Sequence, residues 1–148
     1  MNEAHYHLVL NHLPIIIPIL GLLVIIGGFI VKSEIVKRVA YCIFILGAIT
    51  AFAAIATGDG AEEVVRHIDG ISTNLVHEHE EKAEVFALLS YILGVSSILA
   101  LWSNSKKKSY ANYIAYIVIV FCIVVLYFAQ QTGTTGGEIR HSEIRKKY

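Results

Sequence analysis

The chain has 148 residues, of which 55% are hydrophobic and only 16% are charged, and its formal net charge at pH 7 is zero. This composition excludes an ordinary soluble domain, and the absence of a basic patch interleaved with aromatic residues excludes nucleic acid as a partner. The length leaves room for one domain.

Four uninterrupted apolar runs predict four membrane-spanning helices. Each run is about long enough to cross the roughly 30 Å of hydrocarbon in a bilayer, and backbone groups in lipid pair best within a helix. We therefore expect an all-α, integral membrane four-helix bundle that forms a single transmembrane domain over residues 1–148. The expected spans are about 12–31, 39–57, 80–102 and 110–130, with an outer segment at 58–79 and an outer C-terminal tail at 131–148.

The short loops after the first and third spans carry most of the basic charge. Residues 32–38 and 103–109 hold six Lys or Arg residues and a single acid, Glu34. By the positive-inside rule these loops are cytoplasmic and both termini are outside. The basic residues of the tail oppose this orientation, but the first helix usually dominates the choice. These tail residues are Arg140, Arg145, Lys146 and Lys147.

The first two spans have features that bear on a site at their outer ends. His12 lies at the expected outer hydrocarbon boundary, and Pro14 suits the first turn of a helix. If the helix instead extends outward from about Leu8, Pro14 and Pro18 would loosen it. The second span is rich in Gly and Ala, which permit close helix packing and would also leave room for a flat cofactor.

The outer segments carry closely spaced ionisable residues. Residues 61–68 have the spacing of a short interfacial helix. At the start of the third span, His77, Glu80, Glu81 and Glu84 recur on one helical face, whereas His79 lies on another. The Gly-rich segment 132–137 predicts a turn that folds back over the outer face.

Ionisable residues are strongly segregated between the two sides of the membrane. All seven histidines and eleven of the twelve acids fall on the expected outer side. Ionisable groups this close to hydrocarbon are costly and therefore indicate function. We expect a His-rich polar site in the outer third of the bundle and inert packing in the inner half. The histidines are His5, His7, His12, His67, His77, His79 and His141.

One interpretation is a haem b held between helices by two neutral imidazoles. His12 and His79 are the expected axial pair, because they lie at the same outer depth on different helices. His67 and His141 are further candidates, and the haem propionates would turn toward Arg66 or Arg140. The chain has no Cys-x-x-Cys-His sequence, which excludes covalent c-type attachment.

The alternative is a divalent or dinuclear metal site that binds iron, zinc or copper. Four-helix bundles build such sites from carboxylates and Glu-x-x-His pairs. Glu138 and His141 have that spacing, and the start of the third span would supply the remaining ligands. The expected metal ligands are His77, Glu81, Glu84, Glu138 and His141.

Several short motifs resemble those of a bacterial four-helix integral membrane family of unknown function. They are the segment 7–14 (His-Leu-Val-Leu-Asn-His-Leu-Pro), Thr57-Gly58 after the second span, a histidine that opens the third span, and Thr-Gly-x-x-Gly-Gly-Glu at 132–138. Relatives of that family occur fused to, or near, cytochrome c-type domains. The resemblance implies a redox role, with His7, His12, one of His77 and His79, and the Gly136-Gly137 turn as site residues. The chain departs from the family in having Leu8 where proline is common, and in its acidic entrance to the third span.

Together these observations predict a multi-pass protein of the bacterial inner membrane whose His-rich face is outward. We expect a cytochrome b-like electron carrier, rather than a stand-alone enzyme, that exchanges electrons with a cytochrome c-type protein or with other membrane subunits. Metal binding is the second function considered, and a non-catalytic subunit of a larger membrane complex is the third. Homo-oligomerisation is compatible with all three.

Overall fold

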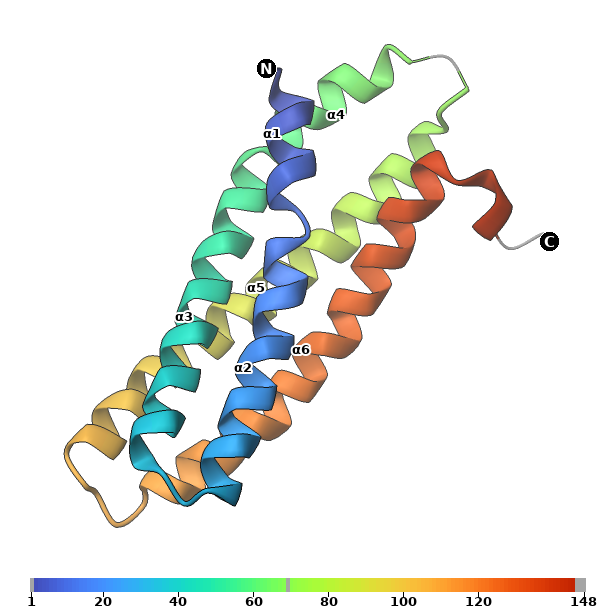
Figure 1. Cartoon of the computed structure of the whole chain (residues 1–148). Coiled ribbons are helices and arrows are strands. Elements are labelled where there is room, and N and C mark those ends of the chain that lie inside the picture. Colours follow the sequence, from blue (N-terminus) through green and yellow to red (C-terminus); the bar gives the residue numbers. More distant parts are fainter. Residues whose placement is uncertain (1, 69, 146–148) are drawn as a thin grey trace.

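The computed structural model describes residues 2–68 and 70–145, and within them it is all-helical. The long helices are α2 (Leu13–Ile30), α3 (Glu34–Ala56), α5 (Thr73–Ser105) and α6 (Ala111–Arg140), and they run alternately up and down (Figure 1). The shorter elements are α1 (Glu3–Leu10), α4 (Gly58–Arg66) and the 3-10 helix η1 (Ser142–Ile144). The prediction of an all-α chain with four long apolar helices is confirmed. Lys146 and Lys147 of the basic tail, and the acid Asp69, lie outside the described residues.

The four long helices pack in a ring. Helix α2 lies against α3, α3 against α5, α5 against α6, and α6 returns to α2. One end of the bundle is formed by α1, α4, the first turns of α5 and the last turns of α6, and we call it the histidine end (Figure 1). The opposite end, formed by the loops 31–33 and 106–110, is called the lysine end.

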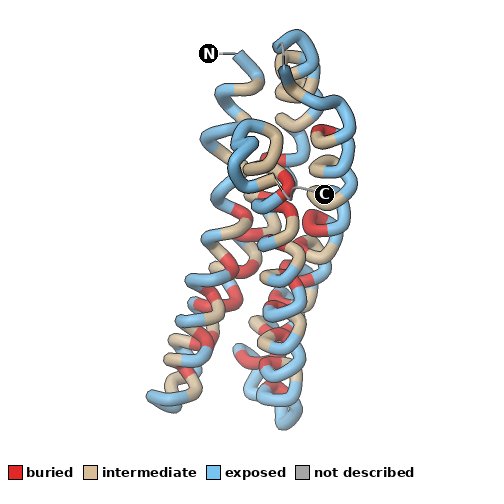
Figure 2. The backbone as a smooth tube through the Cα atoms, turned by 90° about the vertical axis from the view of Figure 1, so that its right-hand side faces the viewer, coloured by how far each residue is buried: buried red, intermediate tan, exposed pale blue. Residues whose placement is uncertain are grey.

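The outer surface of the bundle is suited to lipid. Large apolar side chains are exposed on every long helix, for example Leu23, Phe52, Leu88 and Ile117. A helix that is apolar all round is typical of a membrane span, and all four long helices are long and apolar enough to cross a membrane. Figure 2 shows buried positions recurring along the helices while much of each helix stays exposed.

Small residues let the helices approach closely inside the bundle. A Cβ added at Gly21 would lie 2.6 Å from the ring of Phe44, and one added at Gly94 would lie 2.6 Å from Ala48 Cβ. Such contacts are the usual basis of helix association in lipid, where apolar surfaces gain little by leaving the solvent. The Gly and Ala residues of the spans therefore serve packing.

The helices are longer than the bilayer requires. Helix α5 has 33 residues and α6 has 30. At a rise of about 1.5 Å per residue they measure about 50 and 45 Å, against roughly 30 Å of hydrocarbon. Relative to the expected spans 80–102 and 110–130, most of the additional length of both helices is at the histidine end.

A break at Asn11 and His12 separates α1 from α2 (Figure 1). Pro14 has no N–H to donate to the Leu10 carbonyl, and its ring crowds that group. The expectation that Pro14 and Pro18 would loosen an outward extension agrees with the structure at Pro14 only, because Pro18 lies within the continuous helix α2. His12 becomes the N-cap residue of α2, without a side-chain capping bond.

The expected turn at residues 132–137 is wrong, because α6 continues as a helix to Arg140. The glycines bring α6 close to its neighbours instead. A Cβ at Gly136 would lie 2.9 Å from the His79 ring, and one at Gly133 would lie 3.6 Å from Ile15 Cδ1. The tail therefore does not fold back over the outer face at this point.

The sequence predicts only inert packing in the half of the bundle away from the histidines. This prediction is wrong at the lysine end, where charged and polar side chains form a network. The ammonium of Lys37, with a side chain only 5% exposed, bonds to Glu34 at 2.7 Å and to the amide oxygen of Asn112 at 3.0 Å. Arg38 Nε donates to Asn104 Oδ1 at 2.6 Å, and the Asn104 amide donates to Glu34. This network joins α3 to both α5 and α6 at the lysine end.

Candidate functional site

His7 reaches from α1 to the end of α3. Its Nδ1 lies 3.1 Å from the carbonyl oxygen of Ala54 and 3.2 Å from Thr57 Oγ1. The Thr57 hydroxyl is itself within bonding distance of the Ala53 and Ala54 carbonyls. The ring is partly buried, and it fastens the short α1 to the bundle.

His79 lies between α5 and α6 at the same end of the bundle. Its Nδ1 lies 3.1 Å from Thr135 Oγ1. That hydroxyl is close to two backbone carbonyls of its own helix, Gln131 at 3.2 Å and Thr132 at 3.1 Å. The ring lies beside Gly136, whose lack of a side chain leaves the room that the imidazole occupies.

These contacts suit one tautomer of each imidazole. A backbone carbonyl only accepts hydrogen bonds, so the contact of His7 Nδ1 with the Ala54 carbonyl is a hydrogen bond when Nδ1 carries the hydrogen. His79 Nδ1 can likewise donate to the Thr135 hydroxyl when that hydroxyl donates to a backbone carbonyl of its own helix. In this tautomer the lone pair of each neutral ring is on Nε2. This is the arrangement of metal-ligating histidines, in which the second ring N–H is held by another protein group.

Both histidines, which lie just outside the expected apolar spans, favour the neutral form. Burial is the main cause that lowers the pKa of His7, opposed by its bond to Ala54. Burial also lowers the pKa of His79, and a charge on the nearby His7 lowers it further. The two rings are therefore close enough for the charge state of one to affect the other.

The structure does not place His12 with this pair. Its side chain is exposed at the break between α1 and α2, whereas His7 is the histidine near His79. The break changes the direction in which α1 presents its side chains, so equal depth along the chain did not identify the partner. The predicted pair of His12 and His79 is thus replaced by His7 and His79.

The remaining predicted haem-site residues lie apart from these two rings. Arg66 is exposed and pairs with Glu62 at 2.6 Å. The exposed His67 places Nδ1 2.7 Å from the Glu63 carbonyl, and the exposed His141 pairs with Glu143 at 2.9 Å. Arg140 is also exposed. None of these four residues contacts His7 or His79 in the interactions described.

The predicted metal ligands are not gathered into one site. His77 lies 3.4 Å from Glu81 on the exposed face of α5, and Glu84 is exposed one turn further on. Glu138 and His141 are at the end of α6, and His141 turns to Glu143 instead. Among residues 2–68 and 70–145, no three His, Cys, Asp or Glu side chains are placed to hold a metal ion.

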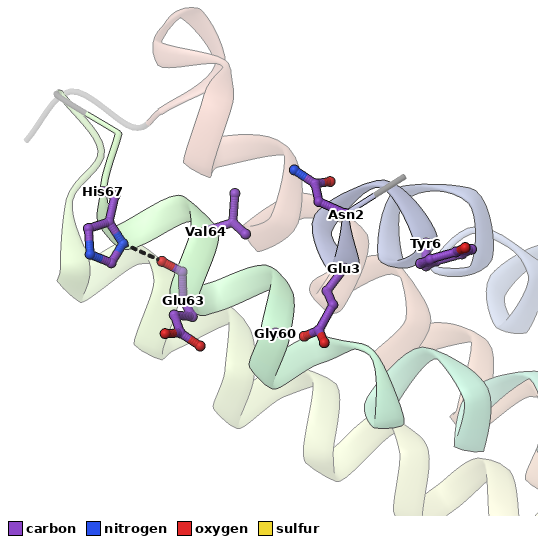
Figure 3. Close-up of a pocket in the computed structure, with 7 residues that line it drawn as sticks. All are labelled: Asn2, Glu3, Tyr6, Gly60, Glu63, Val64 and His67. Atoms are coloured by element: carbon purple, nitrogen blue, oxygen red, sulfur yellow. Dashed lines mark hydrogen bonds between the residues drawn. The ribbon is translucent and has the colours of Figure 1, made fainter.

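A separate hollow of about 620 Å³ lies between α1 and α4 (Figure 3). Glu3 reaches from α1 to Gly60, where a Cβ would overlap its carboxylate. Glu63 and His67 line the far side, with the His67 ring held by its own helix. The hollow is open and is not lined by His7 or His79.

Comparisons of the chain with protein-family models, curated proteins and solved structures find no match.

Sequence reasoning did not identify the two threonines that orient the imidazoles. Thr57 and Thr135 were assigned to a helix exit and to a turn, since each is followed by glycine. A usable signal was present in the i, i+3 pair Thr132 and Thr135, which are buried on one face of α6. Thr132 Oγ1 donates to the Lys82 carbonyl at 3.1 Å and so holds α6 against α5 beside the site.

Proposed function

We propose that His7 and His79 are the axial ligands of a haem b at the histidine end, and that the protein transfers single electrons there. The observation that carries the proposal is the state of the two rings. Each ring turns its Nδ1 toward a carbonyl or threonine oxygen, and its Nε2 makes no hydrogen bond among the described residues. The two rings come from different helices, as axial ligands on the two faces of a haem can.

The number of donors favours haem over a bare metal ion. A zinc or copper ion bound by protein alone takes three or four side-chain ligands. Here two imidazoles are together and no carboxylate or thiol of the described residues completes the set. An iron porphyrin brings four nitrogens of its own and needs only the two axial ligands. The donor set therefore fits haem.

The chain's own residues have definable roles in such a site. Thr135 and the Ala54 carbonyl would keep the imidazoles in the Nδ1–H tautomer and fix their orientation. Gly136 leaves the space in which the His79 ring lies. A bound haem would supply reversible one-electron chemistry, and the surrounding shell of polar groups would tune its potential.

The position of the site suggests the partner. The histidine end projects beyond the expected spans, within reach of a water-soluble protein. With the lysine end on the cytoplasmic side, as the positive-inside rule favours, the site faces outward and both termini are outside. We infer an electron carrier of the bacterial inner membrane that serves a cytochrome c-type protein or other membrane subunits.

The direct test is an absorption spectrum of the purified chain combined with metal analysis. We expect a Soret band that shifts on reduction with dithionite. His7→Ala and His79→Ala should each abolish it, whereas the matched control His12→Ala should retain it because that side chain is exposed.

Three other results would each redirect the proposal. Loss of the band in His12→Ala but not in His7→Ala would restore the pair predicted from the sequence. A colourless protein with stoichiometric iron, zinc or copper would favour the metal function. A protein free of haem and metal that co-purifies with other membrane subunits would favour a non-catalytic role.

A further inference from the structure

A shallow apolar hollow lies on the lipid-facing side of α6. Its volume is about 370 Å³, and only apolar and aromatic side chains line it. The lining residues are Tyr116, Ile117, Val120, Phe121 and Val124. They extend over nine residues of helix, from 116 to 124, or about 12 Å at 1.5 Å per residue. In a membrane-spanning helix this groove is in contact with acyl chains rather than with water.

The lysine end above the hollow has a large excess of positive charge. Its two loops and the adjoining helix ends hold six Lys or Arg residues and one acid, Glu34. Glu34 is already bonded to Lys37 and Asn104. The exposed loop lysines therefore form no ion pair with any described residue. These lysines are Lys32, Lys106, Lys107 and Lys108.

The lysines of the second loop and the residues that line the hollow follow one another along the chain. Lys106, Lys107 and Lys108 lead directly into α6, and Tyr113 is exposed between them and the hollow. Lys108 Nζ lies 5.6 Å from the ring centroid of Trp102, an exposed aromatic residue of the kind that marks the membrane interface. At the other side of the groove, the rings of Tyr116 and Phe29 stack with centroids 5.1 Å apart and link α6 to α2.

We propose that this surface binds a phospholipid with an anionic headgroup from the leaflet at the lysine end. The headgroup would lie against Lys106, Lys107 and Lys108, and one acyl chain would lie in the hollow. A basic segment beside the membrane attracts anionic lipid, and the groove adds apolar contact along the chain. A zwitterionic lipid would make the same apolar contact with the groove, but its headgroup, which carries no net charge, would not be attracted by the lysines in the same way. The proposal is independent of the haem site.

The test uses the full chain in detergent, with phosphatidylglycerol and phosphatidylcholine of identical acyl chains as probes. Native mass spectrometry and the thermal unfolding midpoint report binding. We expect at least a tenfold preference for phosphatidylglycerol. Replacing Lys106, Lys107 and Lys108 together by Gln should bring the ratio of the two affinities close to one, because each lysine contributes up to about fivefold to the attraction of an anionic lipid. The matched control, Lys82→Gln with Arg140→Gln at the histidine end, should leave it unchanged.

A second pair of variants tests the groove. Val120→Trp fills the hollow from an exposed position and should weaken the binding of both lipids, whereas Ile123→Trp, exposed but outside the hollow, should not. Equal binding of the two lipids, or an unchanged preference in the lysine variant, would overturn the proposal. So would displacement of phosphatidylglycerol by inorganic phosphate at equal concentration, or binding that Val120→Trp leaves intact.

Discussion

The imidazole of His79 lies directly against Gly136 of the neighbouring helix. A Cβ at position 136 would be 2.9 Å from His79 Cε1 and 3.3 Å from Nδ1, closer than side-chain carbons normally approach. The ring is also bonded to Thr135, the residue before this glycine. Two consecutive residues of α6 therefore set where the imidazole lies and which of its nitrogens faces the threonine.

Replacing Gly136 by Ala should displace the His79 ring. The added methyl group leaves no room for the present rotamer, and overpacking of this kind costs about 1–3 kcal/mol. We expect a lower thermal midpoint and loss of the Soret band. Gly133→Ala is the matched control, because its Cβ would lie 3.6 Å from Ile15 Cδ1, an ordinary contact. It should gain up to about 1 kcal/mol from helix propensity. Equal behaviour of the two variants would contradict this account.

Replacing Thr135 by Val should leave the shape of the site unchanged but remove the oxygen that holds His79 Nδ1–H. Loss of such an outer hydrogen bond typically costs 10–100-fold in affinity for the bound metal group. We expect haem retention to fall by about that factor and the reduction potential to change, as measured by haem transfer to an acceptor protein and by redox titration. Thr134→Val, in which the exposed neighbouring threonine is changed, should match the parent in both measurements.

The four helices were predictable because a membrane imposes a length and a composition that a sequence displays directly. The sequence does not show directly how each helix is rotated about its own axis. The sequence predicts His12 at the lipid boundary, but the helix breaks beside Pro14, and in the structure His12 is exposed while His7 is partly buried. Counting residues along the chain predicts how deep a side chain lies in the bundle. The direction in which the side chain points depends also on where the helix breaks.

The glycine-rich end of α6 and the lysine end show a second limit of prediction from the sequence, which concerns contacts between different helices. Glycine permits a turn and also permits close packing, and only the presence of His79 beside Gly136 decides between the two. Likewise, the sequence places Lys37 in the short basic loop 32–38, whereas the structure places it buried in the first turns of α3. Its partner Asn112 belongs to another helix, which the spacing of residues within one helix does not reveal.

Arg145 closes the end of α6, and its removal should loosen that end. Its Nε donates to the Glu138 carbonyl at 2.7 Å and its terminal nitrogen to the Ile139 carbonyl at 3.0 Å. These are two of the carbonyls that a helix leaves unpaired at its C-terminus. We expect Arg145→Ala to speed amide exchange over residues 137–141 without changing it at Thr135. Arg140→Ala, exposed and without such bonds among the described residues, should leave exchange unaltered; a similar increase there would contradict the capping role.

Replacing Lys37 by Met should destabilise the lysine end. The change removes the bond to Asn112 and the pair with Glu34, and it leaves a buried polar network incomplete. Because Glu34 is half exposed and can be hydrated, the cost should be that of hydrogen bonds to a charged group, about 1–3 kcal/mol, rather than that of a fully buried ion pair. Lys106→Met, in an exposed loop, should change the free energy of unfolding by less than about 0.5 kcal/mol. Equilibrium unfolding in mixed micelles compares the two variants. If Lys37→Met were as stable as the parent, the contacts among α3, α5 and α6 at this end would contribute no net stability, and apolar packing alone would hold the helices together.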